Sequence, residues 1–335
     1  MSTLTVFCPL GLSNRLRVLL SGLALAEASG RQFKMLWPIT PACAAPFAEL
    51  YVNPWPVETV TALSVADLPY ISGWFGYLPD LLATNESILI IGHSSWLIRP
   101  KQFPWHDNLL ARCQLLFAEL QPTPFIQYGV DSFRQRYFRP TMVGVHLRRG
   151  DLLRQRPDTA SNTAQAMAAV DDFLNMNPDA GILLCTDDGA VDPNTGRHLR
   201  GEDVQKTFQL RYGPRGVWTT PRSLDRRKPV AIQDALIDLY LLRMTDAFVG
   251  TKASSFSELV AFDRDMPYFL AAGATPGYKR IERLSRMTGL YAVLSKLSIR
   301  QTGKVLPFPA LLHCYATAPF RWIRHLIRSL GSGNN

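Results

Sequence analysis

The sequence has few cysteines, and none lies in a pattern that marks a metal site or a redox centre. Its five cysteines are spread over 335 residues without a C-x-x-C pair, and its six histidines show no i, i+4 pairing. These absences argue against a zinc knuckle, a helical zinc site and a thioredoxin-like motif. Cys8 and Cys185 lie in apolar runs, where free thiols are usually buried. A reducing cytoplasm fits such cysteines best.

Long apolar runs are also missing. No segment reaches the ~18 uninterrupted apolar residues that a membrane span requires, and the first apolar stretch is broken by Arg15 and Arg17, unlike a secretory leader. The glycine-rich fingerprints of dinucleotide-binding folds and of P-loops are absent, which argues against a dehydrogenase or a kinase. We therefore expect a soluble protein that is at most peripherally attached to a membrane.

Acidic residues are missing from the end of the chain. Glu282 is the last acid, and the eight basic residues after it account for eight of the nine net positive charges. A nucleic-acid-binding protein carries such charge on a face of its folded body, so we expect no nucleic-acid partner. Between residues 319 and 330, apolar side chains recur at helical spacing among arginines, which is typical of a helix lying on anionic lipid. A terminal helix packed on the first domain is the alternative.

The sequence does contain a regular alternation of strand and helix patterns. Apolar runs predict strands at residues 4–8, 87–91, 142–147, 181–185, 247–249 and 266–270. Helical spacing predicts helices at 12–30, 164–174, 232–244 and 257–262. This order predicts an α/β protein with parallel sheets, in which ligands bind beyond the carboxyl ends of the strands.

Length and prolines predict how the chain is divided. About 100–200 residues per domain gives roughly two domains, and the two prolines within 121–124 interrupt the helical pattern. We predict an N-terminal acceptor-side domain at 1–124, a nucleotide-binding domain at 125–289 and a basic extension at 290–335. The tryptophans of the first domain suit a sugar acceptor or belong to its core.

The most informative segment follows the predicted strand 142–147 and reads His146-Leu147-Arg148-Arg149-Gly150-Asp151. An arginine fork donates to two phosphate oxygens at once, so guanidiniums at the end of a buried strand favour an anionic ligand. Alternation places His146 and Arg148 on one side of the strand and Arg149 on the other. For Arg149, a structural pair with Asp151 is an equal alternative.

This segment resembles the H-x-R-R-x-D motif of the GDP-fucose-dependent fucosyltransferases, which include α1,6-, nodulation and protein O-fucosyltransferases. Further stretches resemble that superfamily in the same order along the chain: residues 11–15 (GLSNR), 186–188 (TDD), 238–242 (DLYLL) and 254–257 (SSFS). The resemblance runs from Gly11 to about Phe262 and is weak between residues 37 and 140. It implies a GT-B fold, with two Rossmann-like domains facing a cleft.

The resemblance also implies roles for individual residues. Arg148 would grip the β-phosphate of GDP, His146 and one of two aspartates would contact guanine and ribose, and two serines with nearby amides would hold phosphate. The predicted donor-binding residues are Gly11, Asn14, Arg15, His146, Arg148, Arg149, Asp187, Asp188, Ser254, Ser255 and Phe256, and the predicted catalytic residues are Arg148 and Asp151. Ordinary helix capping is an alternative role for Ser254 and Ser255.

The reaction implied is an inverting transfer of fucose from GDP-fucose to a glycan or glycolipid, with no metal and no cofactor. The chain departs from some relatives where they place a catalytic glutamate, because the first acid after the motif is Asp158. Another GDP-sugar as donor and a non-catalytic sugar-nucleotide-binding protein therefore stay open. Asp263 and Asp265 form a D-x-D sequence, but they follow a predicted helix and not a strand, which disfavours a metal site.

Overall fold

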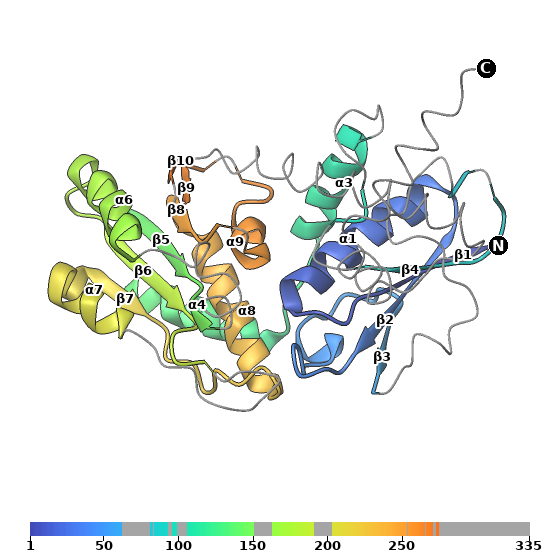
Figure 1. The fold of residues 1–335 in the computed structure, drawn as a ribbon, viewed down its shortest axis with the longest axis horizontal. Coiled ribbons are helices and arrows are strands. Elements are labelled where there is room, and N and C mark those ends of the chain that lie inside the picture. The colour runs from blue at the N-terminus through green and yellow to red at the C-terminus, as the bar shows by residue number, and fades with distance from the viewer. Residues whose placement is uncertain are drawn as a thin grey trace, which may run out of the picture. The chain divides into compact units, whose positions relative to one another are not determined.

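The computed structural model describes residues 1–61, 81–82, 84–92, 96–98, 106–150, 163–190, 203–252, 254–264, 266–270 and 273–274. Residue contacts divide the chain into two units, Met1–Gly289 and Leu290–Asn335. All the described helices and strands belong to the first unit, which contains two β-sheets with helices packed on them (Figure 1).

The first sheet contains four parallel strands in the order β3-β2-β1-β4. These strands are β1 (Thr3–Phe7), β2 (Gln32–Pro38), β3 (Val57–Val60) and β4 (Ile88–Ile91). Helix α1 (Leu12–Ala28) connects β1 to β2 and packs on both, and α3 (His106–Ala118) packs against α1. A short 3₁₀ helix, η1 (Phe47–Glu49), precedes β3. This strand order is that of half a Rossmann fold.

The second sheet contains six strands in the order β10-β9-β8-β5-β6-β7. Its strands are β5 (Met142–Leu147), β6 (Gly181–Thr186), β7 (Gly216–Trp218), β8 (Ala247–Gly250), β9 (Tyr268–Leu270) and β10 (Gly273–Ala274). All neighbours are parallel except β9 and β10. Chain order reverses direction between β5 and β8, and ligands of doubly wound sheets bind at such a switch point.

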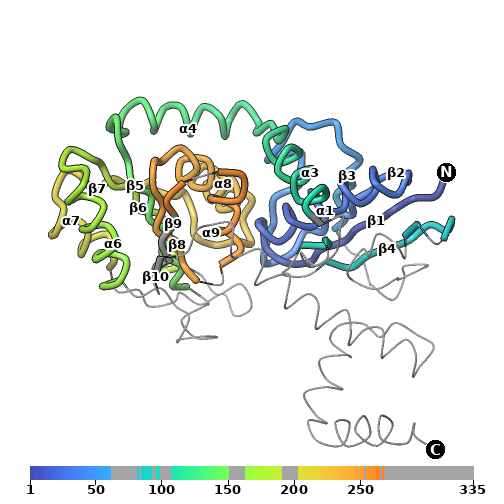
Figure 2. Tube along the Cα trace, turned by 90° about the horizontal axis from the view of Figure 1, so that it is seen from above, coloured from blue at the N-terminus to red at the C-terminus, as the bar shows by residue number. Residues whose placement is uncertain are grey.

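Helices cover both faces of the second sheet. They are α4 (Pro124–Tyr137), α6 (Thr163–Met176), α7 (Val204–Tyr212), α8 (Pro229–Arg243) and α9 (Ser255–Val260), with a 3₁₀ helix η3 (Gly213–Arg215) after α7. Helix α4 runs from the first sheet's part of the chain to β5 (Figure 2) and packs against α8. Residues 119–123 are the short connection between α3 and α4.

Alternation along β5 explains how the sheet is sandwiched. Val143, Val145 and Leu147 belong to an apolar cluster with residues of α6 and α7, whereas Met142 belongs to the cluster that contains the buried side of α8. Gly144 faces α8, and a Cβ there would lie 2.7 Å from the Thr245 hydroxyl oxygen and 3.0 Å from a Leu242 methyl group. Glycine therefore permits the close approach of α8 to β5.

Glycine also ends α1. Gly30 has φ +65°, the Gly30 amide donates to the Glu27 carbonyl, and the Arg31 amide donates to the Ala26 carbonyl. A left-handed residue at this position closes a helix with such bonds, and glycine adopts it without steric cost. The chain then turns directly into β2.

The structure confirms the predicted α/β fold with two Rossmann-like sheets, and it confirms the predicted strands and helices within the described residues, with some ends shifted. The sequence patterns missed β2, β3, β7, β10, α3, α4 and α7. Strand β3 explains why, since its burial pattern contains no fully buried residue and it is held at the sheet edge by pairing with β2. Cys8, Cys43, Cys113 and Cys185 are free and buried, as expected.

Two tryptophans of the first sheet region are core residues and not ligand platforms. Trp37 is fully buried and donates from its indole nitrogen to the Ala45 carbonyl at 2.9 Å. Trp96 is 3% exposed and stacks on Phe262 with ring centroids 4.2 Å apart. Trp55 is partly buried and packs against the core, while Trp74 and Trp105 lie outside the described residues. Among the described helices, none has the length and apolar content needed to cross a membrane.

Candidate functional site

A cavity of about 400 Å³ opens at the carboxyl ends of β5 and β6. Its wall comes from the start of α1, the β7–α8 loop, one side of α8 and the start of α9. We call it the central cavity. Its polar lining comprises Asn14, His146, Arg148, Asp187, Arg226 and Asp238, together with several hydroxyl groups. It therefore lies next to the switch point of the second sheet, where nucleotides bind in doubly wound folds.

Arg148 and His146 both line the central cavity, and Arg149 does not. This is the separation that strand alternation predicted. Residue 148 is fixed at its backbone, because its amide donates to the Thr251 hydroxyl at 2.9 Å, and that hydroxyl donates to the His146 carbonyl at 2.8 Å. The Thr251 hydroxyl thus ties the end of β5 to the residue that follows β8.

His146 is 7% exposed and its surroundings keep it neutral. Burial and, to a smaller extent, the nearby positive charge of Arg148 lower its pKa to about 3. Its Nδ1 lies 2.7 Å from the Ser257 hydroxyl, which accepts a hydrogen bond from the Thr251 amide at 3.0 Å. The hydroxyl proton of Ser257 is then available to Nδ1, an arrangement that favours the tautomer with a proton on Nε2. The ring also contacts Phe256, with centroids 4.7 Å apart.

Arg149 points to the opposite face and has structural partners. It is 3% exposed, its guanidinium donates to the Thr163 hydroxyl at 2.8 Å, and its Nε lies 3.6 Å from the Asp188 carboxylate. Arg149 therefore forms a structural ion pair, as the alternative interpretation expected, but its acid is Asp188. Asp151, its predicted partner and a predicted catalytic residue, lies outside the described residues.

The two predicted aspartates have separate surroundings. One carboxylate oxygen of Asp187 accepts the amides of Arg149 at 2.6 Å and Gly150 at 2.9 Å, so this acid shapes the loop after β5 while it lines the central cavity. Asp188 does not line that cavity. Its carboxylate contacts the Val204 amide at 3.4 Å and Arg149.

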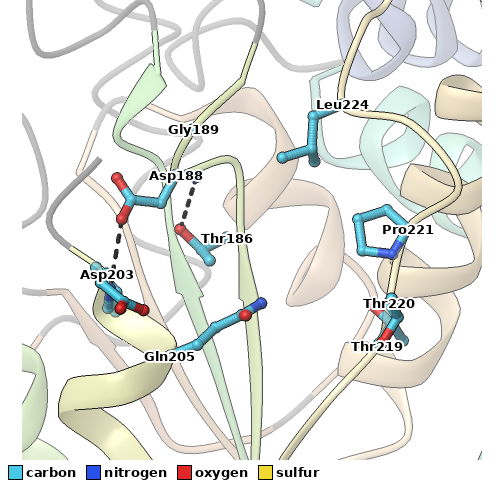
Figure 3. A pocket seen from close by; sticks show the side chains of 10 residues that line it. Thr186, Asp188, Gly189, Asp203, Gln205, Thr219, Thr220, Pro221 and Leu224 are labelled. Carbon is cyan, nitrogen blue, oxygen red and sulfur yellow. Dashed lines mark hydrogen bonds between the residues drawn. The ribbon is translucent and has the colours of Figure 1, made fainter. Parts of the chain in front are cut away.

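Asp188 instead lines a second cavity of about 420 Å³ beside the first (Figure 3). The two cavities share Thr186, Pro221 and Leu224. Figure 3 shows Asp188 and Gln205 on one side and Thr219 and Pro221 on the other. The charged side chains of this second cavity are acids, which suits hydroxyl groups and not phosphates.

The start of α1 contributes two of its three predicted residues to the central cavity. Gly11 and Asn14 line it, and the Asn14 carboxamide oxygen is buried with no hydrogen-bond partner among the described residues. Arg15 is fully buried elsewhere. Its guanidinium donates to the Leu10 carbonyl at 2.7 Å and the Thr40 hydroxyl at 2.8 Å. The structure therefore brings Arg15 to the β2 loop and not to the cavity.

The two serines at the start of α9 differ in position: one caps the helix and the other lines the central cavity. Ser254 is fully buried and caps α9, accepting from the Ser257 amide at 3.4 Å, and it does not line the central cavity. Ser255 and Phe256 do line it. Ser254 is thus a capping residue, and Ser255 is the serine that faces the cavity.

Asp238, on α8, is a cavity carboxylate that the predicted donor-binding set did not include, although it begins the segment 238–242. The Thr219 hydroxyl donates a hydrogen bond to its carboxylate at 2.6 Å, and the Cys185 thiol donates a second hydrogen bond to it. Burial raises the pKa of Asp238 to about 7, and these two hydrogen bonds limit the rise. It is therefore a carboxyl group that changes charge near neutral pH. Its place on the cavity-facing turn of a helix was the available sequence signal.

Among the described residues, no group of three or more His, Cys, Asp or Glu side chains is arranged to hold a metal ion. Asp263 of the D-x-D sequence is bound to Arg243 through an ion pair of 2.6 Å, and Asp265 lies outside the described residues. The first acid of this sequence thus has a structural partner.

No protein-family model and no curated protein matches the sequence. Solved structures do resemble it. The NodZ α1,6-fucosyltransferase soaked with GDP-fucose has a TM-score of 0.53 at 16% identity, over 80% of this chain and 95% of that chain. The fucosyltransferase NodZ from Bradyrhizobium has a TM-score of 0.52 at 13% identity, over 82% and 97%. FUT1 of Arabidopsis thaliana, in complex with GDP, has a TM-score of 0.53 at 11% identity, over 81% of this chain and 70% of that chain.

The chain has the fold of these fucosyltransferases. The GT-B architecture that the sequence resemblance implied is thereby confirmed at the level of fold. In this GT-B protein, the central cavity combines residues from the start of α1 with residues from the second sheet. The identities are low enough that the activity has to be argued from the cavity itself.

Proposed function

We propose that the protein is a glycosyltransferase that moves fucose from GDP-fucose to a hydroxyl group of a glycan or glycolipid. The observation that carries the proposal is the pairing of Arg148 with a neutral His146 in the central cavity. The fold supports it, because similar solved structures were determined with GDP-fucose or GDP.

The chemistry assigned to Arg148 is stabilisation of the leaving group. The bond between fucose C1 and the β-phosphate oxygen breaks, a bond from C1 to the acceptor oxygen forms on the opposite face, and the acceptor hydroxyl loses its proton. Negative charge therefore grows on the β-phosphate during the reaction. A guanidinium held beside that oxygen stabilises the transition state more than the ground state. We propose that this positive charge performs the role that a metal ion has in other glycosyltransferases.

The carboxylate of Asp238 explains why the cavity would select guanine over a pyrimidine base. The guanine edge presents N1–H and an exocyclic amino group, two donors that a carboxylate accepts together, whereas uracil and cytosine lack this pair. Both described acids of the cavity accept hydrogen bonds. Asp187 holds the loop after β5, next to the arginine assigned to the phosphates, so Asp238 on α8 is the acid assigned to the base. His146 Nε2–H adds a donor for a ribose or phosphate oxygen.

The start of α1 is suited to the sugar side of the donor or to the acceptor. The buried Asn14 oxygen needs a donor, which a sugar hydroxyl provides. The first turn of α1 contains no acidic residue, so its amide groups favour negative charge nearby.

A non-catalytic sugar-nucleotide-binding protein is the second candidate. The observation that favours it concerns the general base, since both described acids of the cavity have other roles in the proposal. Asp151, the acid of the motif, and Asp158, the first acid after it, lie outside the described residues. Release of fucose or transfer by the purified protein distinguishes the two candidates, because a binding protein retains GDP-fucose unchanged.

A thermal-shift panel of GDP, UDP, CDP and their sugars tests the donor assignment. Binding to the native state raises the melting temperature in proportion to RT ln(1 + [L]/Kd). We expect GDP and GDP-fucose to stabilise the protein and the pyrimidine nucleotides to have little effect. Equal shifts with GDP and UDP would remove the assignment. A larger shift with another GDP-sugar than with GDP-fucose would reassign the hexose.

We also propose that the basic segment after Glu282 attaches the protein peripherally to the cytoplasmic face of a membrane, where its acceptor is a glycolipid or a nascent glycan. The sequence pattern of 319–330 supports this, and these residues lie outside the described part of the chain. Removing residues 319–335 should reduce binding to anionic vesicles, and salt should weaken that binding because charges are screened over ~8 Å at physiological ionic strength. Unchanged vesicle binding would contradict the proposal, and aggregation of the truncated protein would favour a packed helix.

A further inference from the structure

The β7–α8 loop carries four basic residues, and their positions differ in a way that the sequence does not show. The four are Arg222, Arg226, Arg227 and Lys228. Arg222 donates to the Asp234 carboxylate at 2.7 Å, and Arg227 donates to the Asp225 carboxylate at 2.8 Å. Lys228 is exposed at the start of α8. Arg226 is the member of the four that lines the central cavity.

The backbone of Arg226 is anchored to the first sheet's part of the chain. Its carbonyl accepts the Ala44 amide at 3.1 Å, and the neighbouring Ala42 also lines the central cavity. The Asp225–Arg227 pair and the bond from the Lys228 amide to the Asp225 carbonyl at 2.9 Å hold the loop on either side. Arg226 therefore reaches the cavity from a braced loop and not from a free chain segment.

The positive charge of Arg226 affects the thiol of Cys43, in the loop of the first sheet's part of the chain that also lines the cavity. Burial raises the pKa of the Cys43 thiol, and the positive charges of Arg15 and Arg226 oppose this rise. This agrees with the hydrogen bond from the Ala44 amide to the Arg226 carbonyl, which places Arg226 beside the loop that contains Cys43. Arg148, in contrast, comes from the end of β5. The two arginines thus enter the cavity from different elements.

The charge of the expected ligand calls for a second cation. A sugar ester of a nucleoside diphosphate carries two negative charges at neutral pH, while Arg148 supplies one positive charge and His146 is neutral. Asp187 adds a negative charge to the same cavity, and the ionised form of Asp238 adds another. Without a metal ion, one arginine leaves the diphosphate undercompensated, and a second guanidinium restores the balance.

We propose that Arg226 is a second donor-binding arginine, which contacts the diphosphate from the loop side while Arg148 contacts it from the strand side. The proposal rests on the proposed function, since it assumes that the central cavity binds a nucleoside diphosphate. It assigns a binding role to a residue outside every motif of the sequence. The carbonyl of Arg226 also accepts a hydrogen bond from the Ala44 amide. A diphosphate bound to Arg226 and Arg148 would therefore connect the β7–α8 loop, and with it the first sheet's part of the chain, to the end of β5.

The test measures the affinities of GDP and guanosine for the full-length protein by calorimetry. Arg226→Gln should weaken GDP binding on the order of 10- to 100-fold, the effect of losing one charge-assisted hydrogen bond. Guanosine has no phosphate, so its affinity should not change. Lys228→Gln is the matched control, because it removes the same charge from an exposed residue of the same loop, and it should bind both ligands like the wild type.

Several results would overturn the proposal. Wild-type GDP affinity in Arg226→Gln would overturn it, including the case in which only the KM for the acceptor rises. Equal losses for GDP and guanosine would indicate a structural role, and equal losses in Lys228→Gln would indicate a general charge effect. If the Gln variant does not fold, Arg226→Met retains the apolar stem and is measured in its place. A wild-type protein that binds no GDP refutes the proposed function itself, whereas GDP binding without dependence on Arg226 refutes this inference alone.

Discussion

Strands β1 and β5 are each the first strand of their sheet along the chain. Arg15 lies in the first turn of the helix after β1, Arg148 directly follows β5, and the two arginines have opposite surroundings. Arg15 is fully buried, where its guanidinium donates to Leu10 and Thr40 and lies 5.1 Å from the Trp37 ring. Arg148 lines the central cavity. The arginine after the first strand of each sheet thus has a different place: Arg15 holds loops together, and Arg148 lines a cavity.

The difference arises from what lies opposite each arginine. The loop after β1 presents the Leu10 carbonyl to Arg15, and the loop after β2 presents the Thr40 hydroxyl. These oxygens compensate its buried charge. Arg148 faces an open space of about 400 Å³. An arginine that follows the first strand of a Rossmann-like sheet therefore indicates an anion site only where the tertiary structure leaves room for the anion.

Replacing Arg148 should have the largest effect. Arg148→Ala removes a positioned donor to the leaving phosphate, so transfer should fall by roughly 10²–10³ while the melting temperature is retained. Arg148→Lys should rescue poorly, because a point charge does not reproduce a two-pronged donor. Steady-state rates with GDP-fucose and circular dichroism check both variants. A nearly wild-type Lys variant would show that Arg148 is a structural cation.

The same substitution at Arg15 should reverse this outcome. Arg15→Ala leaves the Leu10 carbonyl and the buried Pro38 carbonyl without their donor and opens a cavity beside Trp37. We therefore expect a loss of about 3 kcal/mol in unfolding free energy. Denaturant unfolding measures it, with Arg148→Ala as the matched control. If Arg15→Ala keeps its stability and loses GDP affinity, the contrast between the two arginines is wrong.

The pH dependence of donor binding should show whether Asp238 binds the donor in its charged form. Burial raises the pKa of Asp238 to about 7. In the proposed function guanine binds the charged form of this acid, so the affinity for the donor should be constant above pH 7 and fall by up to tenfold per pH unit below it. The groups around it are the Thr219 hydroxyl, the Cys185 thiol and the carboxylate of Asp234. His146, with a pKa of about 3, does not titrate in this range.

Calorimetry with GDP-fucose from pH 5.5 to 8.5 measures this dependence, since the phosphates of a sugar diphosphate ester do not titrate there, unlike the terminal phosphate of GDP, whose pKa is about 6. Asp238→Asn should bind more weakly and without the inflection near pH 7. An inflection that persists in this variant would assign the titration to another group.

Chelation should have the smallest effect. The proposed mechanism uses arginine in place of a metal, so transfer activity should be unchanged in excess EDTA. Activity that disappears with EDTA and returns with Mn²⁺ would show that a metal ion contributes the positive charge now assigned to Arg148.

The local sequence was sufficient for the parts of the site that depend on strand geometry. Alternation in 142–149 separates His146 and Arg148 from Arg149, and the structure has this arrangement because each residue of a strand faces the side opposite to its neighbours. The apolar runs likewise predicted β1, β5, β6 and β8, because strands buried on both faces are continuously apolar.

Other features depended on contacts between distant segments, and no local pattern contains them. Strand β3 forms because β2 pairs with it, and Asp188 lies in a second cavity because Arg149 and the Val204 amide hold it there. The sequence by itself determined the fold class and which residues share a side of β5. Only the tertiary structure decided that Arg15 is enclosed and that Asp238 and Arg226 reach the cavity, because enclosure and proximity arise from packing between segments far apart in the chain.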